Sequence, residues 1–130
     1  MENLEIKGRI STFFTPTVNF QAQSGICEVA GESYLEDSFV FYDALIQWIN
    51  DYFAEGAISI QMNFKFFYYN TSTSRAILDI LRTLKMHQEN GKEVITNWYY
   101  PIPDDDEMEA EAQDYMEETG LQMNLIAYKQ

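Results

Sequence analysis

The chain has 130 residues, 46% of them hydrophobic and 15% aromatic, which is enough to build one packed domain over residues 1–130. Its formal net charge of −13 argues against nucleic-acid and anionic membrane partners, because both are bound through clustered lysine and arginine side chains. Cys27 is the single cysteine, and the sequence shows neither a signal peptide nor a membrane-spanning apolar run. We therefore expect a cytoplasmic protein without an internal disulfide.

Short β-forming stretches open the chain. The turn-forming dipeptides Thr15-Pro16 and Ser24-Gly25 separate these stretches and predict reversals of the chain. The predicted strands are 4–10, 17–21 and 26–29. Together they indicate the antiparallel beginning of a sheet.

The first predicted helix rests on an apolar stripe at helical spacing that ends near Gly56. The stripe consists of Phe41, Ala44, Leu45, Trp48, Ile49, Tyr52 and Phe53. Upstream, Ser33 and Glu36 have the spacing of a capping box. This spacing predicts that Ser33 and Glu36 cap the beginning of the helix.

The rest of the chain alternates between strand and helix patterns. In residues 57–69 apolar side chains recur at every second position, which is the period of a strand. The further predicted elements are a helix at 72–89, a strand at 93–100, a helix at 104–119 and a strand at 122–128. The order βββαβαβαβ predicts an α/β (α+β) fold, with about three helices packed on a mixed sheet that is largely parallel in its second half. Because parallel strands point the same way, we expect the turns after Tyr69 and Tyr100 at one edge of the sheet, where open α/β folds place functional groups.

A polar cluster, Asn70-Thr71-Ser72-Thr73-Ser74, stands between the strand at 57–69 and the helix that follows. The first N–H groups of a helix are unpaired and carry partial positive charge, so a phosphate can be added there without breaking the helix. The cluster is therefore either an ordinary N-cap, formed by Asn70, Thr71 or Ser72, or a site of phosphorylation. Arg75, one turn into the helix, either pairs with Asp79 or reaches a phosphate on Thr71.

The helix predicted at 104–119 is strongly acidic. Its apolar residues form a single face that can pack on the sheet, namely Met108, Ala112, Tyr115 and Met116. The acidic residues then form a solvated face, and that face can serve as a recognition surface for a basic partner.

Motifs for catalysis are missing from this sequence. His87 is the single histidine, and it has no cysteine or second histidine at metal-ligand spacing. No serine lies in Gly-x-Ser-x-Gly, and the glycines form no phosphate-binding loop. We therefore expect no catalytic residue, no metal, no cofactor and no enzymatic activity. The tyrosines near the ends of the two central strands, Tyr69 and Tyr100, are expected to anchor a protein partner.

Several segments spread over nearly the whole chain resemble the SiaC family of bacterial regulatory phosphoproteins. They are Gly31-Glu-Ser-Tyr34, Phe41-Tyr42 with Trp48, Asn63-Phe-Lys-Phe66, Tyr69-Asn-Thr-Ser-Thr-Ser74, Leu78-Asp-Ile-Leu81, Asn97-Trp-Tyr-Tyr100 and Leu125-Ile-Ala-Tyr128. Proteins of this family are similar to anti-sigma-factor antagonists of the STAS fold, in which the phosphorylated hydroxyl follows an aspartate in a turn before a helix. The glycine of that turn is absent here, and Thr73 stands in its region.

The resemblance implies specific roles for the polar cluster. Thr71 takes the place of the family's phosphothreonine, Asn70 takes the place of the aspartate, and Ser72 and Thr73 offer alternative hydroxyls. The expected partner-binding residues are Tyr69, Asn70, Thr71, Ser72, Arg75 and Tyr100.

The resemblance also implies three partners and a pathway. In the family, a GHKL-type serine/threonine kinase adds the phosphate and a PP2C-like phosphatase removes it. The unphosphorylated form binds and activates a GGDEF diguanylate cyclase, which raises cyclic di-GMP and promotes biofilm formation or aggregation. Two alternatives remain open: a constitutive protein-binding module that uses the acidic helix, and a partner-switching protein like the anti-sigma-factor antagonists.

Overall fold

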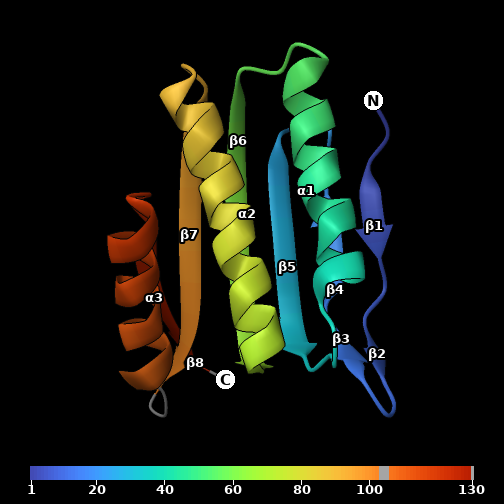
Figure 1. Cartoon of the computed structure of the whole chain (residues 1–130), viewed down its shortest axis with the longest axis vertical. Coiled ribbons are helices and arrows are strands. Elements are labelled where there is room, and N and C mark those ends of the chain that lie inside the picture. The colour runs from blue at the N-terminus through green and yellow to red at the C-terminus, as the bar shows by residue number, and fades with distance from the viewer. Residues whose placement is uncertain (103–105, 130) are drawn as a thin grey trace.

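The computed structural model describes residues 1–102 and 106–129. A six-stranded sheet in the order β1-β4-β5-β6-β7-β8 carries three helices (Figure 1). The strands are β1 (Leu4–Ile6), β4 (Thr17–Phe20), β5 (Ile26–Ser33), β6 (Ser59–Tyr69), β7 (Glu93–Ile102) and β8 (Asn124–Lys129). The helices are α1 (Phe39–Ala54), α2 (Thr71–Glu89) and α3 (Asp106–Thr119). A separate two-stranded ribbon is formed by β2 (Arg9–Ile10) and β3 (Phe14–Thr15).

The predicted mixed sheet is confirmed. The pairs β1–β4 and β4–β5 are antiparallel, whereas β5–β6, β6–β7 and β7–β8 are parallel. The strand predicted over 4–10 is divided into β1 and β2, which belong to different sheets. The helix predicted over 104–119 is described from Asp106, and its first two predicted residues lie outside the described part of the chain.

The capping box predicted at Ser33 and Glu36 is wrong. Helix α1 begins at Phe39 with Ser38 as its N-cap, and the strand predicted over 26–29 continues to Ser33. The reason is the neighbouring strand: β6 has 11 residues, so it offers ladder partners far beyond residue 29, and Ser33 pairs with Tyr69. Capping-box spacing is a local signal, and here the ladder to β6 outweighs it.

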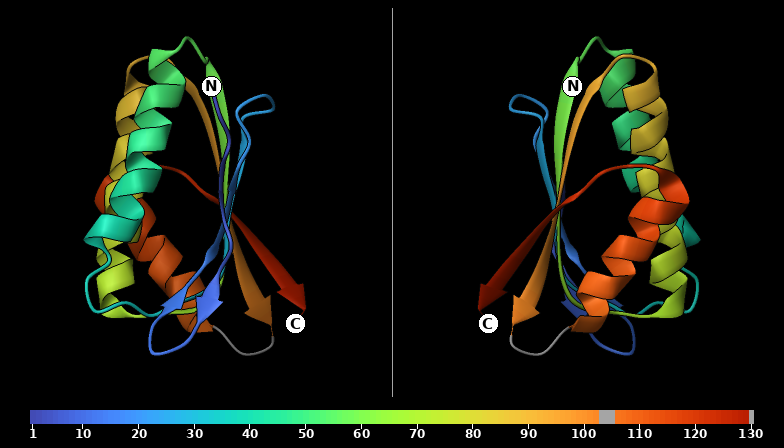
Figure 2. Two further views of the ribbon diagram at one scale, coloured as in Figure 1. Left: turned by 90° about the vertical axis from the view of Figure 1, so that its right-hand side faces the viewer. Right: turned by 90° about the vertical axis from the view of Figure 1, so that its left-hand side faces the viewer.

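All three helices cover the same face of the sheet, as the edge-on views show (Figure 2). The central strand residues that point to this face are fully buried, among them Met62, Phe64 and Trp98, whereas those near the ends and edges of the sheet are only partly buried. Between the helices and the sheet lies the hydrophobic core, to which α1 contributes Leu45 and Ile49. The other face of the sheet has no helix over it in the described part of the chain (Figure 2).

A β-bulge near the end of β6 changes the direction of its last side chains. Gly31 pairs with Phe66, but the next residue of β5, Glu32, pairs with Tyr68, so Phe67 is the extra residue. Strict alternation from Phe66 would place Tyr69 on the uncovered face. The bulge turns Tyr69 to the helix side, where its ring lies edge-on to Phe66 at 5.4 Å and to Trp98 at 6.1 Å.

Candidate functional site

The carboxyl ends of the parallel strands meet at one edge of the sheet, the lower edge in Figure 1, where α1 and α2 begin. We call this the Thr71 edge. The polar cluster that follows β6 lies there, next to the turn between β5 and α1. Strand β7 continues past Tyr100 to Ile102, and the connection after it lies outside the described residues.

Asn70 is the N-cap of α2, so the cap interpretation applies to this residue and not to Thr71 or Ser72. Its backbone is extended, and its side-chain oxygen accepts a hydrogen bond from the Thr73 N–H at 3.1 Å. Its side-chain nitrogen donates to the Leu35 carbonyl at 2.7 Å, which ties the start of α2 to the turn before α1. The helix begins at Thr71, one residue before the predicted start.

The four hydroxyls that follow Asn70 point in different directions. Thr71 is exposed, and its hydroxyl has no hydrogen-bond partner among residues 1–102 and 106–129. Ser72 Oγ accepts from the Ser38 N–H at 2.9 Å and donates to Ser38 Oγ at 2.9 Å, so it caps α1 from outside. Ser74 Oγ lies 2.6 Å from the hydroxyl of Tyr115 on α3. Each helical residue turns the side chain by about 100°, which sends consecutive hydroxyls to different neighbours.

Thr73 is fully buried at 0% exposure. Its hydroxyl donates to Asn70 Oδ1 at 2.9 Å and shares a hydrogen bond of 2.7 Å with Ser33 Oγ, which in turn accepts from the Tyr42 hydroxyl at 2.7 Å. Burial is the main cause that raises the pKa of Tyr42 above its usual range, so this phenol remains a donor. The sequence contained a signal for the burial of Thr73: it precedes Ile77 by four residues and therefore shares the apolar face of α2.

Thr71 opens onto a shallow hollow of about 410 Å³ between α2 and the start of α1. Glu36, Asp37 and Asp79 line it together with Arg75. Arg75 is exposed and forms no ion pair with another described residue, while Asp79 pairs with Arg82 at 3.6 Å. Of the two interpretations of Arg75, pairing with Asp79 is therefore not observed.

Apolar side chains at the Thr71 edge were missed by the sequence analysis. Phe39 lines the hollow and is 67% exposed, and its neighbour Val40 is 77% exposed. Tyr34 and Tyr68 stack with their ring centroids 6.3 Å apart, and nearly half of each is exposed. Tyr34, Phe39 and Val40 lie between the end of β5 and the first turn of α1. Because the predicted helix start was too early, the sequence did not indicate that these side chains are exposed.

Tyr69 and Tyr100 are both half-buried against the core. The Tyr69 hydroxyl donates to the carboxylate of Glu111 and accepts from the Tyr115 hydroxyl at 3.0 Å. Burial, together with these neighbours on α3, raises the pKa of Tyr69 well above its usual range. Their role as partner anchors stays a prediction, and Tyr69 already has an internal role.

The remaining candidate residues lie away from the Thr71 edge. His87 has a ring nitrogen 2.7 Å from Asn50 Oδ1 and packs on Phe53 at 4.5 Å, near the far end of α2. Cys27 is buried, and burial raises the pKa of its thiol to about 12. Within the described parts of the chain, no group of three His, Cys, Asp or Glu side chains could hold a metal ion.

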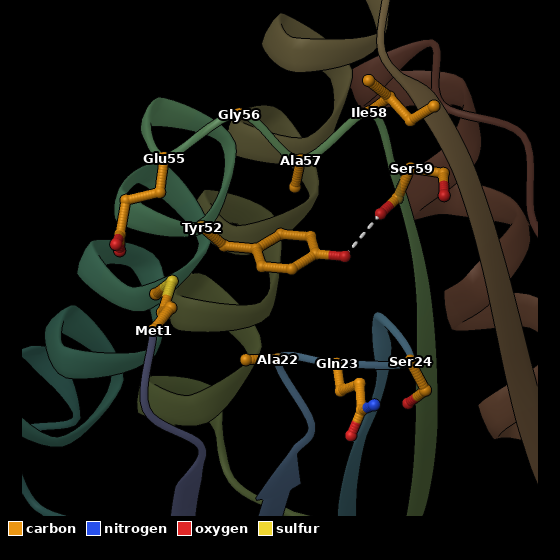
Figure 3. Close-up of a pocket in the computed structure, with 10 residues that line it drawn as sticks. All are labelled: Met1, Ala22, Gln23, Ser24, Tyr52, Glu55, Gly56, Ala57, Ile58 and Ser59. Carbon is orange, nitrogen blue, oxygen red and sulfur yellow. Dashed lines mark hydrogen bonds between the residues drawn. The ribbon is translucent and has the colours of Figure 1, made fainter.

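A second hollow, of about 690 Å³, lies at the opposite end of the sheet, where α1 ends and β6 begins (Figure 3). The Tyr52 ring points into it, and the Tyr52 hydroxyl donates to the Ser59 carbonyl at 2.9 Å. Glu55 supplies the one carboxylate among the ten lining residues. Nothing in this lining pairs a nucleophile with a base.

None of the helices in the described segments is both long enough and apolar enough to cross a membrane.

Comparison with known proteins agrees with this architecture. The family model described as "SiaC family regulatory phosphoprotein" matches residues 10–128. An uncharacterised protein of Pseudomonas aeruginosa strain UCBPP-PA14 is 31% identical over 100 residues, which cover 77% of each chain. The crystal structure of apo-SiaC from P. aeruginosa superposes with a TM-score of 0.85 at 28% identity, over 98% of this chain and 100% of that chain.

A further P. aeruginosa structure contains SiaC as the activator of the diguanylate cyclase SiaD, in complex with it. Its matched chain shares the fold with a TM-score of 0.82 at 24% identity, over 95% of this chain and 100% of that chain. The family match extends over most of the chain and over every element that builds the Thr71 edge. The chain therefore belongs to the SiaC family of regulatory phosphoproteins.

Proposed function

We propose that this protein is a cytoplasmic, non-enzymatic switch that binds a partner through the Thr71 edge and is controlled by phosphorylation of Thr71. The proposed partner is a GGDEF diguanylate cyclase, which the unphosphorylated form activates. A GHKL-type kinase and a PP2C-like phosphatase would set the phosphorylation state. Support comes from the family and from the SiaC chain of P. aeruginosa that was solved with the cyclase SiaD.

The observation that carries the proposal is the accessibility of Thr71 compared with its neighbours. Thr71 is exposed at the first position of α2, next to the hollow and the exposed ring of Phe39. A kinase that modified Ser72 or Thr73 would have to break hydrogen bonds to Ser38 or to Ser33 and Asn70. Thr71 can receive a phosphate without any such loss.

Two features of this position stabilise a phosphate in the folded state, against the repulsion from Glu36, Asp37 and Asp79, which also line the hollow. A phosphate adds roughly −1.5 to −2 charges, and a helix N-terminus stabilises a negative charge by about 0.3–1 kcal/mol. Arg75 follows Thr71 by four residues and is available as a cation on the same helix face. The folded state therefore accommodates the dianion.

The phosphate becomes unfavourable when a partner covers the site. Burying a charged group against an apolar surface costs several kcal/mol, and about 1.4 kcal/mol is already tenfold in affinity. The exposed side chains of Phe39 and Val40 would form part of the covered surface. Phosphorylation is therefore expected to act on binding and not on folding.

The proposal that the protein is not an enzyme rests on the surroundings of its hydroxyls. Ser72 and Thr73 are bonded to serine and asparagine side chains, and His87 lies at the other end of α2. In the described residues we find no histidine or carboxylate hydrogen-bonded to the hydroxyl of Ser72, Thr73 or Ser74 that could act as a general base.

A second candidate function is a constitutive binding module that uses α3. The side chains of Glu107, Asp114 and Glu117 are exposed there and form a surface suited to a basic partner. In this case the charge at Thr71 would not matter. A partner that binds the unmodified protein and the Thr71→Glu variant with equal affinity would support this alternative.

Two measurements test the proposed switch. Mass spectrometry of the protein isolated from its host should place the phosphate on Thr71. Calorimetric titration of a GGDEF cyclase from the same host should show tight binding to the unmodified protein and to Thr71→Ala. Phosphorylated protein should bind at least about tenfold more weakly. Equal affinities for the two forms would refute the switch.

A further inference from the structure

A chain of four hydrogen-bonded groups connects the first turn of α2 to the acidic helix. Ser74 Oγ lies 2.6 Å from the Tyr115 hydroxyl, and Tyr115 donates to the Tyr69 hydroxyl at 3.0 Å. Tyr69 in turn donates to the carboxylate of Glu111. We call this chain the hydroxyl relay. It joins the end of β6 and the adjacent first turn of α2 to α3, and the bonded residues on α3 are 41 and 42 positions away from Ser74 and Tyr69.

The relay exists because two separate features place its members together. The β-bulge at Phe67 turns Tyr69 toward the helices, as described above. Glu111 and Tyr115 are four residues apart and therefore lie on the same face of α3. Tyr115 is 5% exposed, so its hydroxyl can find polar partners only within the protein.

A small surface cleft of about 140 Å³ lies between the end of β6 and the beginning of α3 and is lined on the helix side by Glu107, Met108 and Glu111. Several of its lining residues are exposed, Tyr68 among them. Further along the helix, Ala112 is fully buried. Few dispersion contacts form across an open cleft, so a polar contact carries more of the attachment there. The contact between Tyr69 and Glu111 borders this cleft.

We propose that the hydroxyl relay couples the docking of α3 to the first turn of α2, so that a perturbation at Thr71 reaches the acidic helix. Thr71 precedes Ser74 by three residues in the same helical turn. Each hydroxyl of the relay uses its proton for the next acceptor, so the loss of one member weakens the others. Coupling of this kind is reciprocal: whatever fixes the first turn of α2 also holds α3, and the reverse.

The coupling does not require that Thr71 be phosphorylated in the host, so its test is separate from that of the proposed function. Hydrogen exchange measured by mass spectrometry reports local opening of α3 through peptides within residues 107–119. In Tyr69→Phe and in Ser74→Ala, amide hydrogen exchange in these peptides should be at least about threefold faster, whereas exchange in α1 should stay unchanged. Tyr68→Phe is the matched control, since the Tyr68 hydroxyl has no hydrogen-bond partner in the described segments.

The coupling itself is tested with Thr71→Glu, which adds a favourable negative charge to the first turn of α2. Exchange in α3 should slow by at least about twofold, and this slowing should disappear when Tyr69→Phe is also present. Thermal melting of each variant establishes that it is folded, and Ser74→Ala replaces Tyr69→Phe if the latter is not. Exchange rates in α3 that match the unmodified protein in both relay variants, or slowing that persists in the double variant, would overturn the proposal.

Discussion

The two threonines in the first turn of α2 offer a direct test of the site, because the same substitution should be clearly destabilising at one position and nearly neutral at the other. Valine has nearly the shape of threonine and carries a methyl group in place of the hydroxyl. At Thr73, the hydroxyl is fully buried and bonded to Ser33 and Asn70, at 2.7 and 2.9 Å. At Thr71, it is exposed to solvent.

The expected free-energy change follows from these contacts. Each buried hydrogen bond contributes about 1 kcal/mol, so Thr73→Val should destabilise the protein by about 2 kcal/mol. A larger loss is not expected, since Ser33 still accepts from Tyr42 and Asn70 still accepts from the Thr73 N–H. Thr71→Val should stay within about 0.5 kcal/mol of the unmodified protein, as surface substitutions usually do.

Urea titration of the three proteins measures this difference, provided that the slope of the unfolding free energy stays the same. For a domain of this size, about 2 kcal/mol corresponds to a shift of roughly 8 °C in Tm. If Thr71→Val were as destabilising as Thr73→Val, the assignment of Thr71 as the exposed hydroxyl would be refuted. If Thr73→Val left stability unchanged, the buried hydrogen bonds of the Thr73 hydroxyl would be refuted.

Three further predictions concern the core, the switch and the cysteine. Trp48 is 7% exposed and packs on Phe20 and Tyr52. Trp48→Ala should therefore lower the free energy of unfolding by about 3–5 kcal/mol in a denaturant titration, and a loss below about 1 kcal/mol would contradict the place of Trp48 in the core. Phosphorylated and unmodified protein should melt within a few degrees of each other, whereas a collapse of Tm would mean that the phosphate acts by unfolding. The Cys27 thiol has its pKa raised from 9.0 to about 12, so it binds its proton more tightly when folded; its contribution to stability should be complete below pH 9 and lost as the pH rises toward 12. Stability measured by denaturant titration should fall between pH 8 and pH 11, and it should fall less for Cys27→Ala than for the unmodified protein. Equal losses in the two proteins would contradict this prediction.

The order of elements could be predicted from the sequence because each long segment has a clear period. Strand β6 alternates, and α2 repeats its apolar residues at helical spacing, so both were placed to within two residues at each end. The start of α1 was misplaced because the capping-box spacing at Ser33 is local, whereas the end of β5 depends on a partner strand distant in sequence.

The details of the candidate site needed the three-dimensional structure. The alternation in β6 predicts the wrong face for Tyr69, since a bulge has no signature in the period itself. The hydroxyl cluster was found from its sequence, but the partners of Ser72 and Ser74 lie on α1 and α3. No local pattern connects residues that are more than 30 positions apart.

The uncovered face of the sheet bears on how this protein meets other molecules. Side-chain amides cross it in register: Asn124 donates to Asn97 at 2.9 Å, and Asn97 donates to Asn63 at 2.8 Å. In the neighbouring row, Gln61 separates Ile26 from Ile95 and interrupts what would be an apolar stripe. A broad apolar sheet face without such amides would favour nonspecific association and aggregation. Asn63 and Asn97 are each only 8% exposed, so replacing Asn97 with valine would remove its hydrogen bonds to Asn63 and Asn124 at a nearly buried position and should destabilise the sheet as well as make this face more apolar.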